Sequence, residues 1–133
     1  MDFDVIYFDL KHAIKTHDIV IEKTGGRPGI KDLGQLESVL EHIQNDWYYP
    51  KFEDKLTHLI FGVCNFHTFT DGNKRSSLSL GMYFLNINGF DYCIDRFVDE
   101  LENIIVWVAD NKISKDLLRE ILYSIIYEFE QSE

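Results

Sequence analysis

The stretch from Leu56 to Arg75 reads LTHLIFGVCNFHTFTDGNKR, an apolar helical pattern followed by a polar loop. Apolar side chains recur at helical spacing in its first half, at Leu56, Leu59, Ile60, Val63 and Phe66. Such a stripe is typical of a helix that buries one face. The pattern stops at His67, and Gly72 marks a turn before a second helix begins near Asn73. We therefore expect a short loop that ends at a helix N-terminus.

This loop and the helix start after it carry groups that bind phosphate. The unpaired N–H groups of a first helical turn and the helix dipole favour an anion, and Gly72 permits close backbone approach. Lys74 and Arg75 stand in this turn, where a cation opposes the dipole at a cost of up to about 1 kcal/mol. A bound polyphosphate would offset that cost. Arg75 can fork onto phosphate oxygens, and Lys74 can act as a point charge.

Further residues complete the candidate site. Asp71 offers a hard oxygen ligand for Mg²⁺, and His67 can accept a hydroxyl proton at neutral pH. Asn73 adds an amide, and we expect Phe69 to anchor the loop in the core. Taken singly, these residues have plainer interpretations, since Asp-Gly-Asn is usually a turn and a histidine beside an aromatic is usually packed. The ordered set favours a nucleotide-phosphate site.

Helical spacing also extends over the rest of the chain. The apolar stripes predict a helix capped by Asp9, the helix after Gly72, and three others, around Leu36–Ile43, Phe97–Val108 and Leu117–Ile126. With the helix before His67, these make six helices joined by short loops. We expect an all-α, compact helical bundle forming a single domain over residues 1–133.

Two segments interrupt this helical pattern. Phe3, Val5 and Tyr7 alternate with polar residues, which is compatible with a short strand. The cluster Gly25-Gly26-Arg27-Pro28-Gly29 predicts a loop in which Gly25 or Gly26 caps the preceding helix. That loop, continued to Asp32, is a weaker site candidate through Arg27 and Lys31.

Composition excludes several classes of protein. The formal net charge is −10, and only residues 50–89, with four bases and three acids, are not negative. This balance disfavours direct nucleic-acid binding but allows a local phosphate pocket. The chain shows no apolar run of membrane-spanning length and no secretory leader, so we expect a soluble cytoplasmic protein without membrane contact. The two cysteines, Cys64 and Cys93, stand among apolar residues and are expected to be buried free thiols.

The motif H-x-F-x-D-G-N-K-R resembles the signature of the Fic/Doc family. The resemblance continues on both sides of the motif. Segments similar to the death-on-curing (Doc) branch of the family are His17-Asp18, Gly25 to Asp32, Leu36-Glu37-Ser38, Asn88-Gly89-Phe90 and Val108 to Ser114. It therefore covers nearly the whole chain and implies the compact helical bundle of that family.

The resemblance implies transfer of part of a nucleotide to a protein hydroxyl. His67 would be the general base, Asp71 the Mg²⁺ ligand, and the phosphates of ATP would be bound by Gly72, Asn73, Lys74 and Arg75. Family members with glycine at position 74 typically transfer AMP, whereas Doc-type members with lysine there resemble kinases that transfer the γ-phosphoryl group. Lys74 thus predicts a Doc-like toxin that phosphorylates a target such as elongation factor Tu and blocks translation.

A partner and three alternatives follow. Ser124 and Glu128 match only the start of the self-inhibitory motif of the family, so the resemblance implies a separate, trans-acting antitoxin. One alternative is a Fic-type AMP transferase with the same site. Another is an inactive Fic-like interaction module, which the intact motif disfavours. A metalloprotein built on the other histidines is disfavoured because His12, His17, His42 and His58 form no metal-binding pattern.

Overall fold

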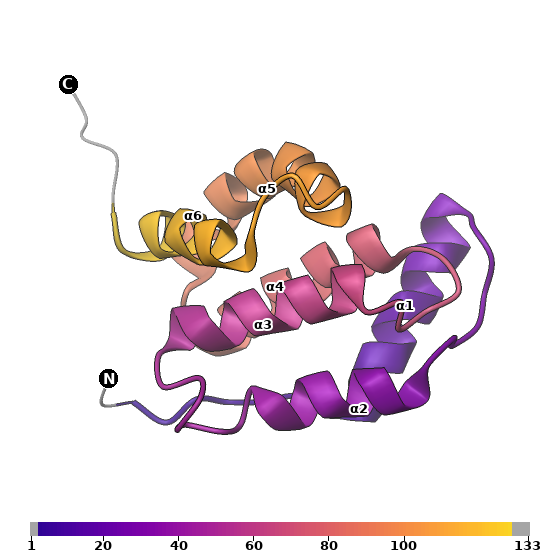
Figure 1. Ribbon diagram of the computed structural model, residues 1–133, viewed down its shortest axis with the longest axis horizontal. Coiled ribbons are helices and arrows are strands. Elements are labelled where there is room, and N and C mark those ends of the chain that lie inside the picture. The colour runs from indigo at the N-terminus through magenta and orange to yellow at the C-terminus, as the bar shows by residue number, and fades with distance from the viewer. Residues whose placement is uncertain (1–2, 129–133) are drawn as a thin grey trace.

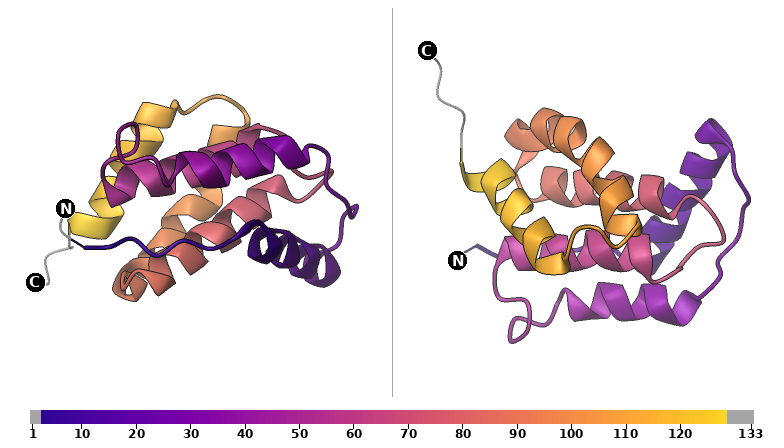
Figure 2. Two further views of the ribbon diagram at one scale, coloured as in Figure 1. Left: turned by 90° about the horizontal axis from the view of Figure 1, so that it is seen from below. Right: turned by 45° about the horizontal axis from the view of Figure 1, so that its top comes forward.

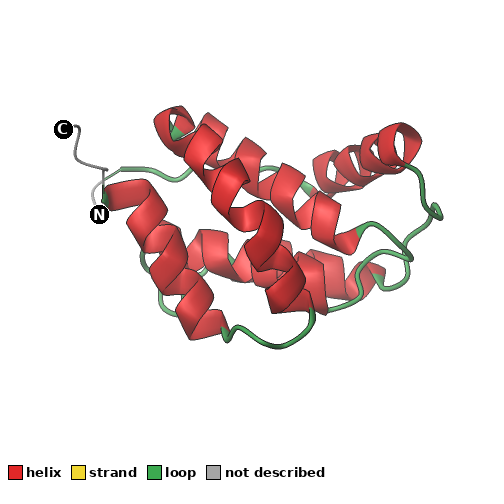
Figure 3. Cartoon of the chain, turned by 90° about the horizontal axis from the view of Figure 1, so that it is seen from above, coloured by secondary structure: helices red, strands yellow, loops and turns green. Residues whose placement is uncertain are grey.

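The computed structural model describes residues 3–128, and within that range the chain contains helices and no strand (Figures 1 and 3). The elements are α1 (Leu10–Thr24), α2 (Leu33–His42), α3 (Phe52–Asn65), α4 (Asn73–Ile87), the 3₁₀ turn η1 (Asp91–Cys93), α5 (Ile94–Ala109) and α6 (Lys115–Tyr127). The all-α fold and the six predicted α-helices are confirmed.

Helix α3 is the centre of the structure. It packs against α2, α4, α5 and α6, and most of its residues are buried on every side. Figures 1 and 2 show α3 and α4 side by side, with α2 on one side of the pair and α5 and α6 on the other. The loop between α3 and α4 lies at the end of the bundle where α1 also ends. The candidate site is therefore carried by the most buried helix of the fold.

Local capping fixes where the helices begin and end. The Asp9 carboxylate accepts a hydrogen bond from the His12 N–H at 2.9 Å, and Gly25, with φ +84°, ends α1. Both assignments agree with the sequence prediction. Asp32 and Ser114 cap α2 and α6 in the same way as Asp9 caps α1. Each cap satisfies an N–H that the helix itself leaves unpaired.

The extended segment before α1 does not form the short strand that its alternating pattern allowed. Its backbone is paired instead by one side chain, because Asn88 accepts from the Ile6 N–H at 2.8 Å and donates to the Ile6 carbonyl at 3.0 Å. The same amide nitrogen donates to the Phe84 carbonyl at 2.9 Å. An asparagine amide thus takes the place of a neighbouring strand and ties the segment to the end of α4.

Two further observations concern the cysteines and whether any helix could cross a membrane. Both cysteines are free and buried, as predicted. Among residues 3–128, the helices are too short or too polar to cross a bilayer.

A partly buried polar network centred on His58 joins α3 to α2 and α6. Lys115 donates to His58 Nδ1 at 2.8 Å, so His58 Nε2 carries the ring hydrogen and donates to His42 Nδ1 at 3.2 Å. The Lys115 ammonium also lies over the rings of Tyr49 and Phe61, at 5.2 and 5.8 Å. Burial first, and then the neighbouring Lys115 and His42, lower the pKa of His58 to about 4. The network therefore needs a neutral His58.

Replacing Gly81 by alanine should destabilise the bundle. A Cβ at position 81 would lie 2.9 Å from Phe97 Cζ and 3.1 Å from Ile60 Cδ1, where α4 crosses α5 and α3. We expect G81A to lower the free energy of unfolding by about 1–2 kcal/mol, because overpacking outweighs the better helix propensity of alanine. Urea denaturation measures the change. The matched control is G34A, exposed in α2, which should be neutral or stabilising, and equal behaviour of both variants would contradict this packing.

Acidification should destabilise the fold through His58. Its pKa of about 4 in the folded chain lies below the ordinary value of about 6.5, so the unfolded chain binds the proton more readily. The contribution of His58 is complete above pH 6.5 and is lost as the pH falls toward 4, by about 3 kcal/mol. Urea titrations at several pH values measure this loss. His58→Gln keeps a donor and an acceptor without titrating, so an unchanged pH slope in that variant would refute the assignment.

Candidate active site

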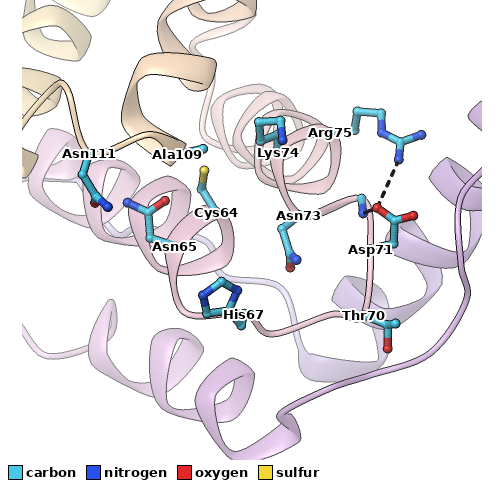
Figure 4. Close-up of a pocket in the computed structure, with 11 residues that line it drawn as sticks. Cys64, Asn65, His67, Thr70, Asp71, Asn73, Lys74, Arg75, Ala109 and Asn111 are labelled. Carbon is cyan, nitrogen blue, oxygen red and sulfur yellow. Dashed lines mark hydrogen bonds and ion pairs between the residues drawn. The ribbon is translucent and has the colours of Figure 1, made fainter.

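The loop between α3 and α4 opens onto a cavity of about 310 Å³. All six predicted site residues line it, together with residues from α3 and the end of α5 (Figure 4). The lining residues are Cys64, Asn65, His67, Thr70, Asp71, Gly72, Asn73, Lys74, Arg75, Ala109 and Asn111. The fold thus brings the whole predicted set to one cavity.

His67 is presented to the cavity by the way α3 ends. Phe66 closes the helix, and His67 then adopts a left-handed conformation with φ +53°. A residue in this conformation commonly ends a helix, but for a side chain other than glycine or asparagine it is unusual. The His67 side chain is exposed and has no hydrogen bond to the described residues. Its ring nitrogens are therefore available to a ligand.

Two buried residues hold the loop behind His67. Phe69 is 1% exposed, which confirms it as the core anchor, and its ring stacks on His17 with centroids 3.8 Å apart and an angle of 2°. Thr68 is completely buried. Thr68 and Phe69 therefore face the core, whereas His67, Thr70 and Asp71 line the cavity.

Asn73 fastens the loop to the first turn of α4. Its Oδ1 accepts from the Phe69 N–H at 3.0 Å and from the Thr68 hydroxyl at 3.2 Å, and its Nδ2 donates to the Phe69 carbonyl at 3.0 Å. One hydrogen on Nδ2 remains for another acceptor. The sequence predicted a phosphate ligand here, and the contacts found are those of a loop clamp. A phosphate role for Asn73 stays a prediction.

Gly72 and Asp71 form the turn into α4. Gly72 has φ +75°, a left-handed conformation that glycine adopts without strain, and its N–H donates to Asp71 Oδ1 at 2.8 Å. The other carboxylate oxygen accepts from the Arg27 N–H at 3.0 Å. The backbone N–H groups of Arg27 and Gly72, and then the cation of Arg75, hold the pKa of the Asp71 carboxyl below its usual value. Asp71 is therefore an anion at neutral pH.

The two cations of α4 are placed differently. Arg75 donates to the Thr24 hydroxyl and, at 2.9 Å, to the Gly25 carbonyl, and it lies 4.0 Å from Asp71 Oδ1. It thus neutralises the C-terminal end of α1. Lys74 is exposed, lines the cavity, and has no hydrogen bond or ion pair to the described residues. Beside it, burial raises the pKa of the Cys64 thiol to about 11, so that thiol stays protonated.

The segment from Gly25 to Asp32, hereafter the strap, lies against the loop. Gly29 accepts from the Thr70 N–H at 3.0 Å, and Thr68 accepts from the N–H groups of Lys31 and Asp32 at 3.0 and 3.1 Å. A Cβ on Gly26 would lie 2.8 Å from Asp71 Oδ2, so this glycine is required for the close approach. The weaker site candidate is thus part of the wall around Asp71.

Sequence reasoning assigned no site role to Asn65 and Asn111. Asn65 donates to the Val108 carbonyl at 3.2 Å and links α3 to the end of α5. Asn111 has φ +59° and ends α5, a conformation that asparagine tolerates. The signal for Asn111 was the Asp-Asn pair after an apolar stripe, which predicts a turn. Its place in the cavity depends on packing between helices that are distant in sequence.

The segment that resembles the start of a self-inhibitory motif has a structural partner. Arg96 donates to the Ser124 carbonyl and hydroxyl at 3.1 and 3.2 Å, and to the Glu128 carbonyl at 2.6 Å. These bonds join α5 to the end of α6. Ser124 and Glu128 are not among the residues that line the cavity.

Comparison with known proteins identifies the family. The family model described as "Fic/DOC family" matches residues 7–85. The chain belongs to the Fic/Doc family. It is 31% identical over 116 residues to "Protein kinase doc" of Escherichia phage P1, which covers 84% of this chain and 89% of the relative. It is also 31% identical over 114 residues to "Toxin Doc" of Mycolicibacterium smegmatis, which covers 83% of this chain and 85% of the relative. The Fic/Doc resemblance seen in the motif is confirmed.

Removing the Asn73 amide should loosen the Fic/Doc loop. Asn73→Ala deletes three hydrogen bonds and leaves the Phe69 N–H and carbonyl unpaired, so we expect a loss of about 1–3 kcal/mol in the free energy of unfolding. Urea denaturation and faster hydrogen exchange at Phe69 measure it. Asn86→Ala, exposed on the same helix, is the control. Equal effects of the two substitutions would show that Asn73 is not a clamp.

Proposed function

We propose that this protein is a Doc-like toxin that transfers the γ-phosphoryl group of ATP to a hydroxyl of a target protein. The observation that carries the proposal is the His67 ring, exposed and without a hydrogen bond to residues 3–128, at a cavity that ends at the N-terminus of α4. The similarity to a relative named as a protein kinase supports a protein-modifying transferase. The same similarity to Doc proteins supports the assignment as a toxin.

His67 acts as the general base in this proposal. As the target hydroxyl attacks the γ-phosphorus, its proton moves to a free nitrogen of the His67 ring. The new bond forms between the hydroxyl oxygen and phosphorus, the bond between the β,γ-bridging oxygen and the γ-phosphorus breaks, and ADP leaves. The left-handed backbone of His67 serves this role because it turns the ring out of α3 toward the cavity.

The phosphates bind at the start of α4. The N–H groups of that turn favour an anion, and that of Gly72 can bind one by leaving Asp71 Oδ1. Lys74 adds a cation without a competing partner among residues 3–128. Arg75 uses Nη1 for the Thr24 hydroxyl and the Gly25 carbonyl, so Nη2 and Nε keep N–H groups that can donate to phosphate oxygens. Asn73 contributes mainly by holding the loop in shape.

Asp71 is the side chain that fits Mg²⁺. Its carboxylate is ionised and borders the cavity, whereas residues 3–128 contain no cluster of three or more histidine, cysteine or acidic side chains able to hold a metal. Mg²⁺ typically uses one or two carboxylates together with phosphate oxygens and water, so one carboxylate suits a magnesium–nucleotide complex. When bound, the ion neutralises charge on the phosphates.

Lys74 favours phosphoryl transfer over AMP transfer. Its ammonium group stands beside the cavity, where a glycine would leave open space for an α-phosphate. A triphosphate must then lie differently, with its γ-phosphoryl group toward His67. AMP transfer from the same site is the alternative reaction. An inactive interaction module is the alternative of another class, and failure to bind ATP in calorimetry would favour it.

The partners follow from the same assignment. We propose elongation factor Tu as the first target to test, with the reaction in the cytoplasm. A separate antitoxin would cover the site, since Ser124 and Glu128 are engaged by Arg96 instead. Modification of the target should therefore fall when the product of a neighbouring antitoxin gene is added. No loss of activity on that addition would contradict inhibition in trans.

ATP labelled at the α- or the γ-phosphate distinguishes AMP transfer from phosphoryl transfer. With elongation factor Tu or a cell lysate as acceptor, we expect label from γ-labelled but not α-labelled ATP on a protein, with a mass gain of one phosphate. His67→Ala should reduce the rate by about 10²-fold or more, because it removes the base. Label from α-labelled ATP with a gain of one AMP would establish the alternative.

The matched control is His12→Ala. This histidine lies in α1, stacks on Tyr83 at 4.0 Å, and is outside the cavity lining. It should keep the activity, and loss of activity in both variants would remove the argument for His67.

A further inference from the structure

His17 is a buried histidine that the proposed reaction does not use. It lies in α1 with no exposed surface, and its Nε2 is 2.7 Å from the backbone carbonyl oxygen of Asp71. That contact joins residues 54 positions apart in the sequence. A carbonyl oxygen only accepts, so Nε2 must carry a hydrogen and donate it.

The other ring nitrogen of His17 has no hydrogen-bond partner in the part of the chain that the structure describes. Nδ1 is buried, and the closest acidic oxygen, Oδ1 of the exposed Asp18, is 3.7 Å away, which is too far for a hydrogen bond. The ring therefore makes one directed bond, to the loop. This arrangement is more than apolar packing, because a leucine or phenylalanine would fill the space without leaving a buried nitrogen unpaired.

The ring holds the loop at two points. One face stacks on Phe69, and its edge donates to the Asp71 carbonyl. Between these two contacts lies Thr70, which lines the cavity. His17 thus grips the loop from the core side while His67 and Asp71 face the cavity.

The Asp71 carbonyl determines where the Gly72 N–H points. The peptide bond between them is planar and trans, so the C=O and N–H groups point in opposite directions. A peptide that precedes a glycine turns over easily, because glycine accepts both signs of φ. If this peptide turned over, a carbonyl oxygen would face the cavity in place of an N–H group, and it would repel phosphate.

We propose that His17 is a positioning residue that prevents this rotation and keeps the Gly72 N–H, which donates to Asp71 Oδ1, on the side of the turn that lines the phosphate subsite. The inference rests on the proposed function for its consequence, which is the binding of Mg·ATP. The orientation of the peptide itself does not depend on nucleotide. The two can therefore be tested separately.

Three substitutions at position 17 separate the hydrogen bond from packing. Glutamine places its amide nitrogen near the position of Nε2 and can donate to Asp71. Asparagine is too short to reach, and phenylalanine keeps the ring that stacks on Phe69 but has no donor. If the hydrogen bond matters, His17→Gln should bind Mg·ATP more tightly than His17→Phe and His17→Asn. If packing alone matters, Phe equals or exceeds Gln.

Two measurements on the full chain read out the effect. The amide resonance of Gly72 in ¹⁵N NMR, without nucleotide, should stay near its wild-type position in His17→Gln and move in His17→Phe and His17→Asn. Calorimetry with Mg·ATP should show Gln within about threefold of wild type and the other two weaker by about tenfold or more. Urea denaturation identifies variants that are folded.

The outcomes are distinct. An unmoved Gly72 resonance in folded His17→Phe, or Mg·ATP binding by that variant at least as tight as by His17→Gln, overturns the role of His17. If the wild-type chain does not bind Mg·ATP, the proposed function fails, and the Gly72 resonance still decides whether His17 orients the peptide.

Discussion

The side-chain amide of Asn73 is the interaction on which the candidate site depends. It binds the backbone of Phe69 on both its N–H and carbonyl groups, so the loop is closed onto the helix that follows it. Without this closure, the loop that carries His67 and Asp71 would be held only from outside α4, by the strap and by His17. Burying the polar groups of this clamp costs little free energy, because they are hydrogen-bonded to each other. The loop also follows directly from α3, whose buried residues fix its position in the core.

The two cations that follow Asn73, Lys74 and Arg75, have different partners, and the composition of the chain does not show this difference. Two cations in the first turn of a helix oppose its dipole, and each needs compensation. For Arg75 the compensation is internal, because the C-terminal end of α1, with the Gly25 carbonyl, lies beside it. For Lys74 there is none among residues 3–128. Lys74 and Arg75 are adjacent in sequence, yet only Lys74 has no competing partner among residues 3–128 when an anion approaches.

Much of the fold and part of the cavity lining could be predicted from the sequence, because both depend on local patterns. Apolar spacing located the helices, Asp9 and Gly25 marked the ends of α1, and the ordered motif contains six of the residues that line the cavity. The function of individual motif residues depended on distant partners. The bond from His17 to Asp71 and the bonds from Arg75 to the end of α1 join segments about 50 residues apart. No periodicity encodes such contacts.

The strap contacts both Asp71 and Arg75. Its backbone at Arg27 occupies one oxygen of Asp71, and its Gly25 carbonyl, with the Thr24 hydroxyl just before it, occupies Nη1 of Arg75. A magnesium triphosphate would need the same oxygen and the same guanidinium. Binding would therefore exchange hydrogen bonds within the chain for bonds to phosphate, and the net gain would be smaller than a count of the new contacts suggests. Gly26, which cannot carry a Cβ so close to Asp71, makes this occupied arrangement possible. The Gly72 N–H is held by Asp71 Oδ1, whereas Lys74 has no such competitor among residues 3–128, so Lys74 is the group that a phosphate can reach first.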